Sequence, residues 1–250
     1  MTVEELRDGQ KIIDSLIQSA DKTNEAVLDG PFDFRKYAEA SLKILFFMRE
    51  PNSYNDGGWD YKDVLLKHDH FFGIFNAIAE CVINKKTLEE VLTFLKDNWD
   101  SEIHKKEAIY SIAFTNINNI PGGSSVGKNG SIEKLAENNK KIIKEKLIVY
   151  NPDIIISPDT DVPRVWEVIK SSLEIEDDNN CIHFDRNGEK THPDDLFIAN
   201  YSCLTKTNRK ITILGTYHPS AAKWGQFSAD EWITAVVKAI NWSRKNFLYK

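Results

Sequence analysis

The chain has 250 residues, of which 41% are hydrophobic and 28% are charged, and its formal net charge is −6. This composition is that of an ordinary globular protein, and the acidic balance argues against a generic nucleic-acid binder without excluding a local basic groove. No run approaches the roughly 20 apolar residues that span a bilayer, and the polar start of the chain lacks an apolar secretion core. We therefore expect a cytoplasmic protein with no membrane partner.

The cysteines argue against a metal centre. Cys81, Cys181 and Cys203 lie far apart in the sequence and form no Cys-x-x-Cys pair. Zinc and iron–sulfur sites usually need such pairs, so we expect no metal, no cluster and no other cofactor. An odd number of cysteines without a signal sequence also fits a reducing cytoplasm.

The first half of the chain alternates between helical and strand patterns. Apolar spacing predicts helices over residues 3–28 and 34–40, and the run before Arg49 predicts a strand over 43–48. Further helices are expected at 60–66, 71–83 and 88–98, the last of which begins with a capping-box pattern at Thr87 and Glu90. A second strand at 108–115 and a loop at 122–130 follow.

The second half continues the alternation. Its predicted elements are a long charged helix (132–149) with a solvated face, a strand (153–157), a helix (162–173), a late strand (210–216) and a closing helix (229–247). The acidic residues 174–195 are predicted to be linker-like. Strands separated by helices indicate an α/β three-layer sandwich with a central, mostly parallel four-stranded sheet. We expect one domain over 1–250, with 1–40 as a helical extension packed on it.

Polar side chains follow several of these strands. Glu50 comes after the first strand, Asn116 after the second, and His218 after the last. Each alone fits a structural role, as a helix cap or ion-pair partner, a turn residue or a buried histidine. In an open parallel sheet, however, ligands bind where the strands end at their carboxyl edge. The joint placement therefore predicts a site.

The motifs around these residues resemble one family. "MREPN" (Met48 to Asn52) stands where the uracil-DNA glycosylase superfamily carries a Gly-x-Asp-Pro-Tyr-like motif. "IAFTNINNIPGG" offers an Asn at the end of the next core strand, and "GTYHPSAAKWGQF" contains the His-Pro-Ser motif that follows the last one. The chain thus resembles a divergent member of this superfamily, and the motifs span residues 42–227.

The resemblance implies a DNA N-glycosylase, a hydrolase of base excision repair that acts on DNA carrying a damaged or modified base and is expected to be a monomer. Glu50 would stabilise a cationic sugar and activate water, and His218 would donate a hydrogen bond to the leaving base. Asn116 and Asn52 would read the flipped-out base. Phosphate contacts would come from Ser220, Gly122, Gly123 and Arg49.

Two auxiliary features follow from the same resemblance. An aromatic floor under the base would come from Tyr54, Trp59, Phe71 or Phe72. A local basic rim would come from Lys206, Arg209, Lys210 and Lys223.

Several positions depart from the family pattern. Met48 replaces a glycine, Glu50 an aspartate and Asn52 a tyrosine, and Ala221-Ala222 stand where many members have Pro-Leu. Because Asn is smaller than Tyr, we expect weak selection against bases with a small polar group at carbon 5, such as 5-hydroxymethyluracil.

Two alternatives stay open. One is a catalytically inactive protein that keeps the glycosylase fold for binding. The other is a P-loop nucleotide-binding protein that uses residues 122–129, since Gly122, Gly127 and Lys128 satisfy G-x-x-x-x-G-K. Asn129 then stands where a Ser or Thr would hold magnesium, which disfavours this alternative.

Overall fold

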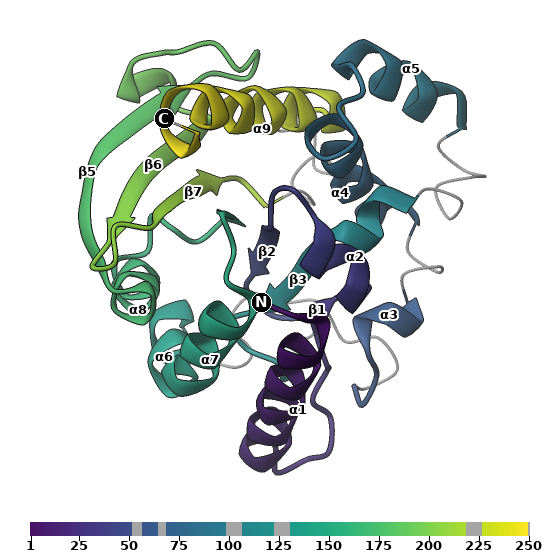
Figure 1. The fold of residues 1–250 in the computed structure, drawn as a ribbon, viewed down its shortest axis with the longest axis vertical. Coiled ribbons are helices and arrows are strands. Elements are labelled where there is room, and N and C mark those ends of the chain that lie inside the picture. Colours follow the sequence, from purple (N-terminus) through teal and green to yellow (C-terminus); the bar gives the residue numbers. More distant parts are fainter. Residues whose placement is uncertain (52–56, 65–68, 99–106, 123–130, 219–226, 250) are drawn as a thin grey trace.

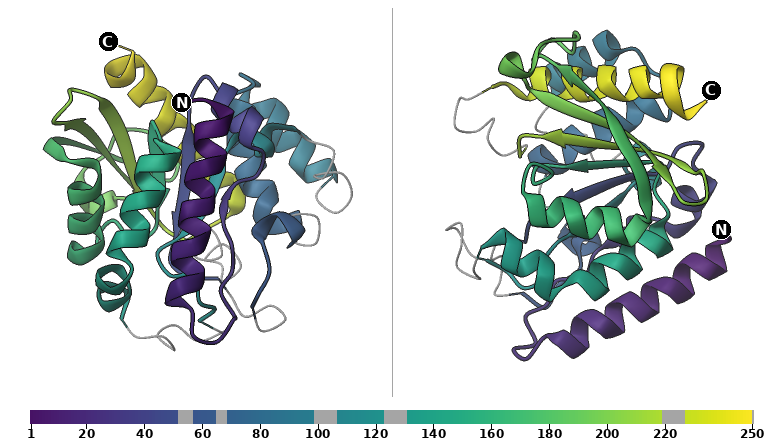
Figure 2. Two further views of the ribbon diagram at one scale, coloured as in Figure 1. Left: turned by 60° about the horizontal axis from the view of Figure 1, so that its bottom comes forward. Right: turned by 90° about the vertical axis from the view of Figure 1, so that its left-hand side faces the viewer.

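The computed structural model describes residues 1–51, 57–64, 69–98, 107–122, 131–218 and 227–249. Within them, seven strands form one mixed sheet in the order β1-β3-β2-β4-β7-β6-β5 (Figure 1). Helices flank the sheet on both faces, so the chain has an α/β fold (Figure 2).

The four predicted strands are neighbours in the middle of the sheet and are all parallel. They are β2 (Ile44–Met48), β3 (Ala113–Asn116), β4 (Ile154–Ser157) and β7 (Lys210–Thr216). Leu45 pairs with both Ala113 and Ile155, and Ile156 pairs with Leu214. Their carboxyl ends therefore lie along one edge of the sheet, where ligands of open parallel sheets bind.

The prediction of a four-stranded sheet is wrong in extent, because antiparallel strands enlarge the sheet on both sides. β1 (Gly30–Pro31) pairs with β3, and β6 (Ile198–Thr205) pairs with both β7 and β5 (Ile175–Phe184). Residues 175–184 of the predicted linker at 174–195 thus form a strand. Its acidic side chains were misleading because β5 lies at the sheet edge, where polar residues are tolerated.

Each face of the sheet buries a separate hydrophobic core. Along β2, Phe46 and Met48 belong to one core, and Leu45 and Phe47 belong to the other, because successive side chains of a strand point to opposite faces. The three-layer arrangement follows from these two buried faces, each covered by helices.

The helices divide between the two faces (Figure 2). The first core is covered by α3 (Tyr61–Val64), α4 (Asp69–Val82), α5 (Leu88–Asn98), the short helix η2 (Glu107–Ser111) and α9 (Ala229–Ser243), which runs on into a π-helical turn, η5 (Arg244–Leu248). The second is covered by α1 (Val3–Ala20), α2 (Phe34–Glu39), α6 (Ile132–Asn138), α7 (Lys140–Tyr150) and α8 (Pro163–Leu173). A single turn, η3 (Pro193–Asp195), precedes β6.

The structure confirms one predicted helix start and differs from several other predicted element boundaries. The capping box at α5 is present, because Thr87 and Glu90 exchange backbone-to-side-chain hydrogen bonds of 2.8 and 3.2 Å. The predicted helix over 132–149 is interrupted at Asn139, whose side chain donates to Asn118 Oδ1 at 3.3 Å. The predicted strand over 108–115 begins as the helix η2. The first helix ends at Ala20 rather than at residue 28.

Within the ranges given above, no helix is long and apolar enough to cross a membrane.

Candidate functional site

The predicted site residues lie at the carboxyl edge of the parallel strands. Met48 and Asn116 are register partners at the ends of β2 and β3. The chain then continues the pairing briefly, since Asn118 N donates to Arg49 O at 2.9 Å. Glu50 and His218 follow β2 and β7 by two residues each. A carboxylate, an amide and an imidazole therefore come to the same edge from different strands.

Glu50 sits against a glycine. Gly122 N donates to Pro51 O at 3.0 Å, which joins the segment after β3 to the segment after β2. A Cβ atom added to Gly122 would lie 2.0 Å from Glu50 Oε1, a distance at which atoms overlap. Only glycine therefore lets the Glu50 carboxylate occupy this place. The Gly122 N–H is used by Pro51, so the predicted phosphate contact at Gly122 would have to displace that bond.

Asn116 is a buried amide at the end of β3. It is 0% exposed, and within the described ranges neither Oδ1 nor Nδ2 makes a hydrogen bond of normal geometry. Tyr61 lies beside it: burial raises the pKa of the Tyr61 phenol, and the Asn116 side chain opposes that shift. An amide carries both a donor and an acceptor, which suits it to reading the edge of a base.

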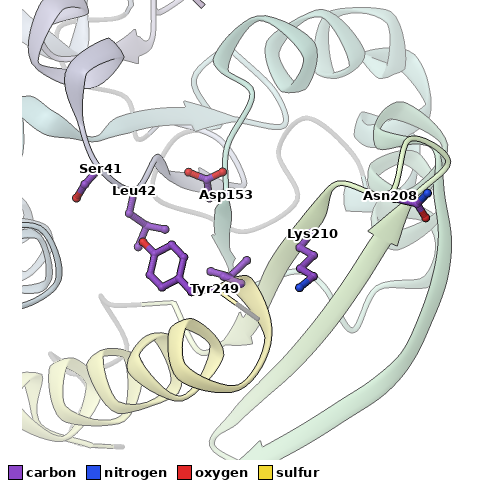
Figure 3. A pocket seen from close by; sticks show the side chains of 7 residues that line it. Ser41, Leu42, Asp153, Asn208, Lys210 and Tyr249 are labelled. Atoms are coloured by element: carbon purple, nitrogen blue, oxygen red, sulfur yellow. The ribbon is translucent and has the colours of Figure 1, made fainter.

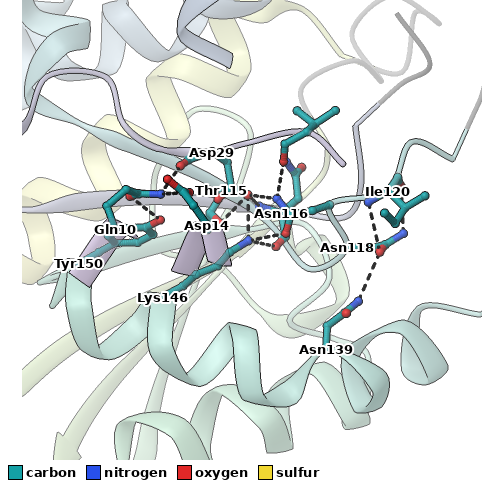
Figure 4. A network of polar contacts seen from close by, with 12 residues as sticks. Gln10, Asp14, Asp29, Thr115, Asn116, Asn118, Ile120, Asn139, Lys146 and Tyr150 are labelled. Atoms are coloured by element: carbon teal, nitrogen blue, oxygen red, sulfur yellow. Dashed lines mark hydrogen bonds and ion pairs between the residues drawn. The ribbon is translucent and has the colours of Figure 1, made fainter. Parts of the chain in front are cut away.

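A buried polar network fixes the backbone around Asn116 (Figure 4). Asp29 Oδ2 accepts hydrogen bonds from Asn116 N at 3.0 Å, Thr115 Oγ1 at 2.9 Å and Asn119 Nδ2 at 2.8 Å. Lys146 Nζ, from α7, donates to the same Asp29 oxygen at 2.9 Å, to Asn116 O at 3.0 Å and to Asn119 Oδ1 at 2.8 Å. The end of β3 is thus held by an ion pair whose two side chains are both 0% exposed.

Burial works against the charge on Lys146 in this network. It lowers the pKa of the ammonium group, while the charge of Asp29 and its hydrogen bond raise it. A buried ion pair is weak evidence for stability, but losing one partner is costly because the other charge stays buried. The Asp29–Lys146 pair therefore has a structural role: it fixes the position of Asn116 beside the candidate site.

A second ion pair spans the ends of β2 and β4. Arg49 donates to Asp159 Oδ1 from Nη2 at 2.5 Å and from Nε at 3.2 Å. Burial alone lowers the pKa of Arg49, but Asp159, together with the charges of Glu50 and Asp161, raises it overall. The predicted phosphate-binding guanidinium is thus already engaged by a carboxylate.

His218 belongs to the same cluster of charges. Burial lowers the pKa of its imidazole, the Asp159 charge opposes this shift, and the Arg49 charge reinforces it. The net direction is downward from the usual value of about 6.5, which favours a neutral ring at pH 7. A neutral imidazole can donate a hydrogen bond to a developing anion without carrying a charge.

The lowered pKa of His218 predicts a pH dependence of stability. Between its folded-state pKa and the unfolded value of about 6.5, the unfolded chain binds the proton and the folded chain does not. The free energy of unfolding should therefore fall as the pH drops through this window. We expect urea denaturation at about pH 7.5 and about pH 5 to show a smaller pH-dependent loss for His218→Gln than for the wild type. His192→Gln, at a side chain that is 82% exposed, is the matched control, and equal losses in wild type and His218→Gln would contradict the prediction.

Several predicted site residues fall outside the described residues. They are Asn52, Gly123 and Ser220, along with residues 123–129 of the phosphate-loop alternative, Lys223 and Tyr54. Their assignments stay predictions.

The aromatic floor and the basic rim are partly revised. Phe72 packs inside the first core, with its ring centroid 6.0 Å from that of Phe114, so it is a core residue. Trp59 contacts Tyr61 edge to face at 5.1 Å, and Tyr61 in turn interacts with the Asn116 side chain. Arg209 and Lys210 stand at the start of β7, on the amino edge of the parallel strands, and there they cannot form a rim around the carboxyl edge.

Two residues of the site were given no role from the sequence. Asp159 follows β4, and its pairing with Arg49 joins positions 110 residues apart, which no local pattern reveals. Lys146 lies in a segment that was predicted to be solvated. A signal existed, because Ile143, Leu147 and Tyr150 mark the buried stripe of α7 and Lys146 falls within it.

A pocket of about 400 Å³ lies at the opposite edge of the sheet (Figure 3). Its lining is mixed: Ser41, Leu42, Asp153, Asn208, Lys210, Leu248 and Tyr249. The Asp153 carboxylate already accepts a hydrogen bond from Lys43 N at 2.9 Å and lies 3.6 Å from Arg209 Nη2. Lys210 of the predicted basic rim belongs to this lining, whereas none of the described catalytic, base-binding or phosphate-binding candidates does.

Comparison with known proteins leaves the site to be interpreted from its own chemistry. No protein-family model matches the chain, and no curated protein matches it in sequence. Among the described side chains, no group of three or more His, Cys, Asp or Glu is arranged to hold a metal ion.

Proposed function

We propose that the chain is a DNA glycosylase-like hydrolase that cleaves the N-glycosidic bond of a flipped-out uracil or modified pyrimidine. The proposal rests on one observation: Glu50, Asn116 and His218 lie at the same edge of four parallel strands. They also follow one another along the chain in the same order as the motifs of the family that the chain resembles. The three groups are chemically different, and the proposed reaction has a use for each.

The reaction follows from the three groups. Water attacks carbon 1 of the sugar as the carbon–nitrogen bond breaks, and the bond's electron pair leaves with the base. Glu50 stabilises the positive charge that develops on the sugar and takes a proton from the attacking water. His218 donates a hydrogen bond to the base as negative charge gathers there. The products are the free base, which takes up a proton, and an abasic sugar with a new hydroxyl group.

Asn116 supplies recognition. Extruding a base from the stack costs a few kcal/mol, which the pocket must recover through stacking and hydrogen bonds. The Asn116 amide is buried on a strand end held by the Asp29–Lys146 pair, so its orientation is set before the ligand arrives. A pre-positioned donor and acceptor lose little entropy on binding.

A binding protein without catalysis is the second candidate, and the local charge favours it. The described ionisable side chains around Arg49 include three carboxylates, those of Glu50, Asp159 and Asp161. This balance is unfavourable for the phosphates of a DNA strand. A protein partner would suit such an acidic edge.

A panel of oligonucleotides tests the proposal. Each carries one uracil or one modified pyrimidine in single- or double-stranded form, and alkaline cleavage reports abasic sites. We expect strand cleavage with at least one substrate under single-turnover conditions. Binding to DNA in a gel-shift assay without base release would favour the non-catalytic candidate. The absence of both DNA binding and base release would rule out the proposal.

A further inference from the structure

Asp159 is held rigidly in the loop after β4. Val162 N donates to Asp159 O at 3.2 Å, which closes the turn. The neighbouring Thr160 side chain lies on Gly215 of β7, where an added Cβ atom would be 2.1 Å from Thr160 Oγ1. The missing side chain at Gly215 thus lets the loop settle against the sheet, and this fixes the direction in which the Asp159 carboxylate points.

The two oxygens of that carboxylate have different surroundings. Both hydrogen bonds from Arg49 go to Oδ1. Oδ2 is buried, and within the described residues it has no hydrogen-bond partner, although Asp159 is only 4% exposed. A buried acceptor left unsatisfied is unfavourable, and in native proteins such a group calls for an explanation, one of which is a role in the site.

The position of Asp159 coincides with the point where strand order reverses. β2 and β4 are neighbours in the sheet. After β2 the chain continues to β3, which lies on the far side of β2 from β4, and after β4 it continues to β5, β6 and β7, which lie on the far side of β4 from β2. Ligands of open α/β sheets bind in the crevice between such strands, at their carboxyl ends. Arg49 follows β2 and Asp159 follows β4, the two strands that flank this point, and the charge of Asp159 acts on His218.

We propose that Asp159 is a specificity-determining residue whose Oδ2 accepts a hydrogen bond from an N–H group on the edge of the bound base. This inference rests on the proposed function, which places a base at this edge. A carboxylate can only accept hydrogen bonds, so the ligand must donate. Arg49 donates both of its hydrogen bonds to Oδ1, and this leaves Oδ2 for the ligand.

The arrangement makes the substitution Asp159→Asn informative. Arg49 can only donate, so it holds the amide oxygen of the new side chain. The NH₂ group then takes the place of Oδ2, and an acceptor in the site becomes a donor. Cytosine and uracil exchange donor and acceptor at two neighbouring positions of their edges. A residue that reads one of these positions must therefore discriminate between the two bases, and the substitution must reverse the preference.

The experiment measures binding of 2′-deoxycytidine and 2′-deoxyuridine by NMR titration. We expect the wild type to prefer one nucleoside by about 5-fold to 150-fold, and Asp159→Asn to prefer the other. Asp161→Asn, at an exposed carboxylate in the same loop, is the matched control and should keep the wild-type ratio. An unchanged ratio in folded Asp159→Asn, or no binding of either nucleoside by the wild type, overturns the inference.

A second variant covers the case in which Asp159→Asn does not fold. The double substitution Arg49→Met/Asp159→Ala removes both charges of this ion pair and should bind both nucleosides without preference. If it keeps the wild-type preference, the inference is overturned. Failure of the proposed function has a different result: base release is absent from every oligonucleotide, whereas the reversal of nucleoside preference is still observed. Base release with no reversal removes only the role of Asp159.

Discussion

Replacing Lys146 by methionine is expected to lower the free energy of unfolding by about 3–5 kcal/mol. The substitution leaves the buried Asp29 carboxylate without the ammonium group that now pairs with it. It also removes the donor that Asn119 Oδ1 and Asn116 O share. Urea denaturation followed by circular dichroism measures the change, and a shift in midpoint at constant slope would report a loss of stability alone.

Two further variants separate lost charge pairing from lost packing. The double substitution Asp29→Asn/Lys146→Met buries no charge, and it should regain about 1–3 kcal/mol relative to Lys146→Met. Lys11→Met breaks the ion pair with Asp8 on the exposed face of α1 and should change stability little. If Lys146→Met costs no more than Lys11→Met, the buried pair does not hold the end of β3.

The second large effect concerns catalysis. Under the proposed function, Glu50→Gln and His218→Ala should each lower the single-turnover rate of base release by about tenfold to a thousandfold. Each group acts mainly in the transition state, so the affinity for substrate DNA should change far less. Rates come from rapid-quench assays on the best substrate of the oligonucleotide panel, and affinities come from fluorescence anisotropy.

Two exposed residues provide matched controls for these variants. Asp161→Asn removes a carboxylate at the same edge, and His192→Ala removes an exposed imidazole; both should keep the wild-type rate. A wild-type rate in Glu50→Gln or in His218→Ala would show that the role given to that residue is wrong. A parallel loss of affinity and rate would indicate a binding role instead.

The middle of the sheet was predictable because it is buried on both faces. β2 and β4 appear in the sequence as the short apolar runs "ILFFM" and "IIIS". Short continuous apolar runs of this kind are typical of strands that are buried on both faces. β6 was missed because buried polar residues interrupt its pattern. Asn200 is 0% exposed, and its amide donates to Ala239 O at 3.1 Å and to Ser243 Oγ at 2.8 Å. These partners in α9 cannot be read from the strand itself.

The candidate site was predictable to the extent that its residues adjoin predictable strands. Glu50, Asn116 and His218 each end an apolar run or follow it closely, so the rule for parallel sheets brings them to one edge. The Arg49–Asp159 pair depends on β2 and β4 being neighbours, and this strand order follows from packing rather than from local sequence. The need for glycine at position 122 likewise becomes visible only when the Glu50 carboxylate is in place.

The antiparallel strands at the two margins of the sheet affect how copies of the chain meet. Among the described strands, β1 closes one margin with only two residues, and Pro31 has no N–H to offer a neighbour. β5 closes the other margin with register shifts between Ile175 and Asn180, in a stretch that carries Glu176, Asp177 and Asp178. Irregular pairing and repelling carboxylates both oppose the addition of a foreign strand. These margins therefore protect the hydrophobic middle of the sheet from aggregation through edge-to-edge pairing.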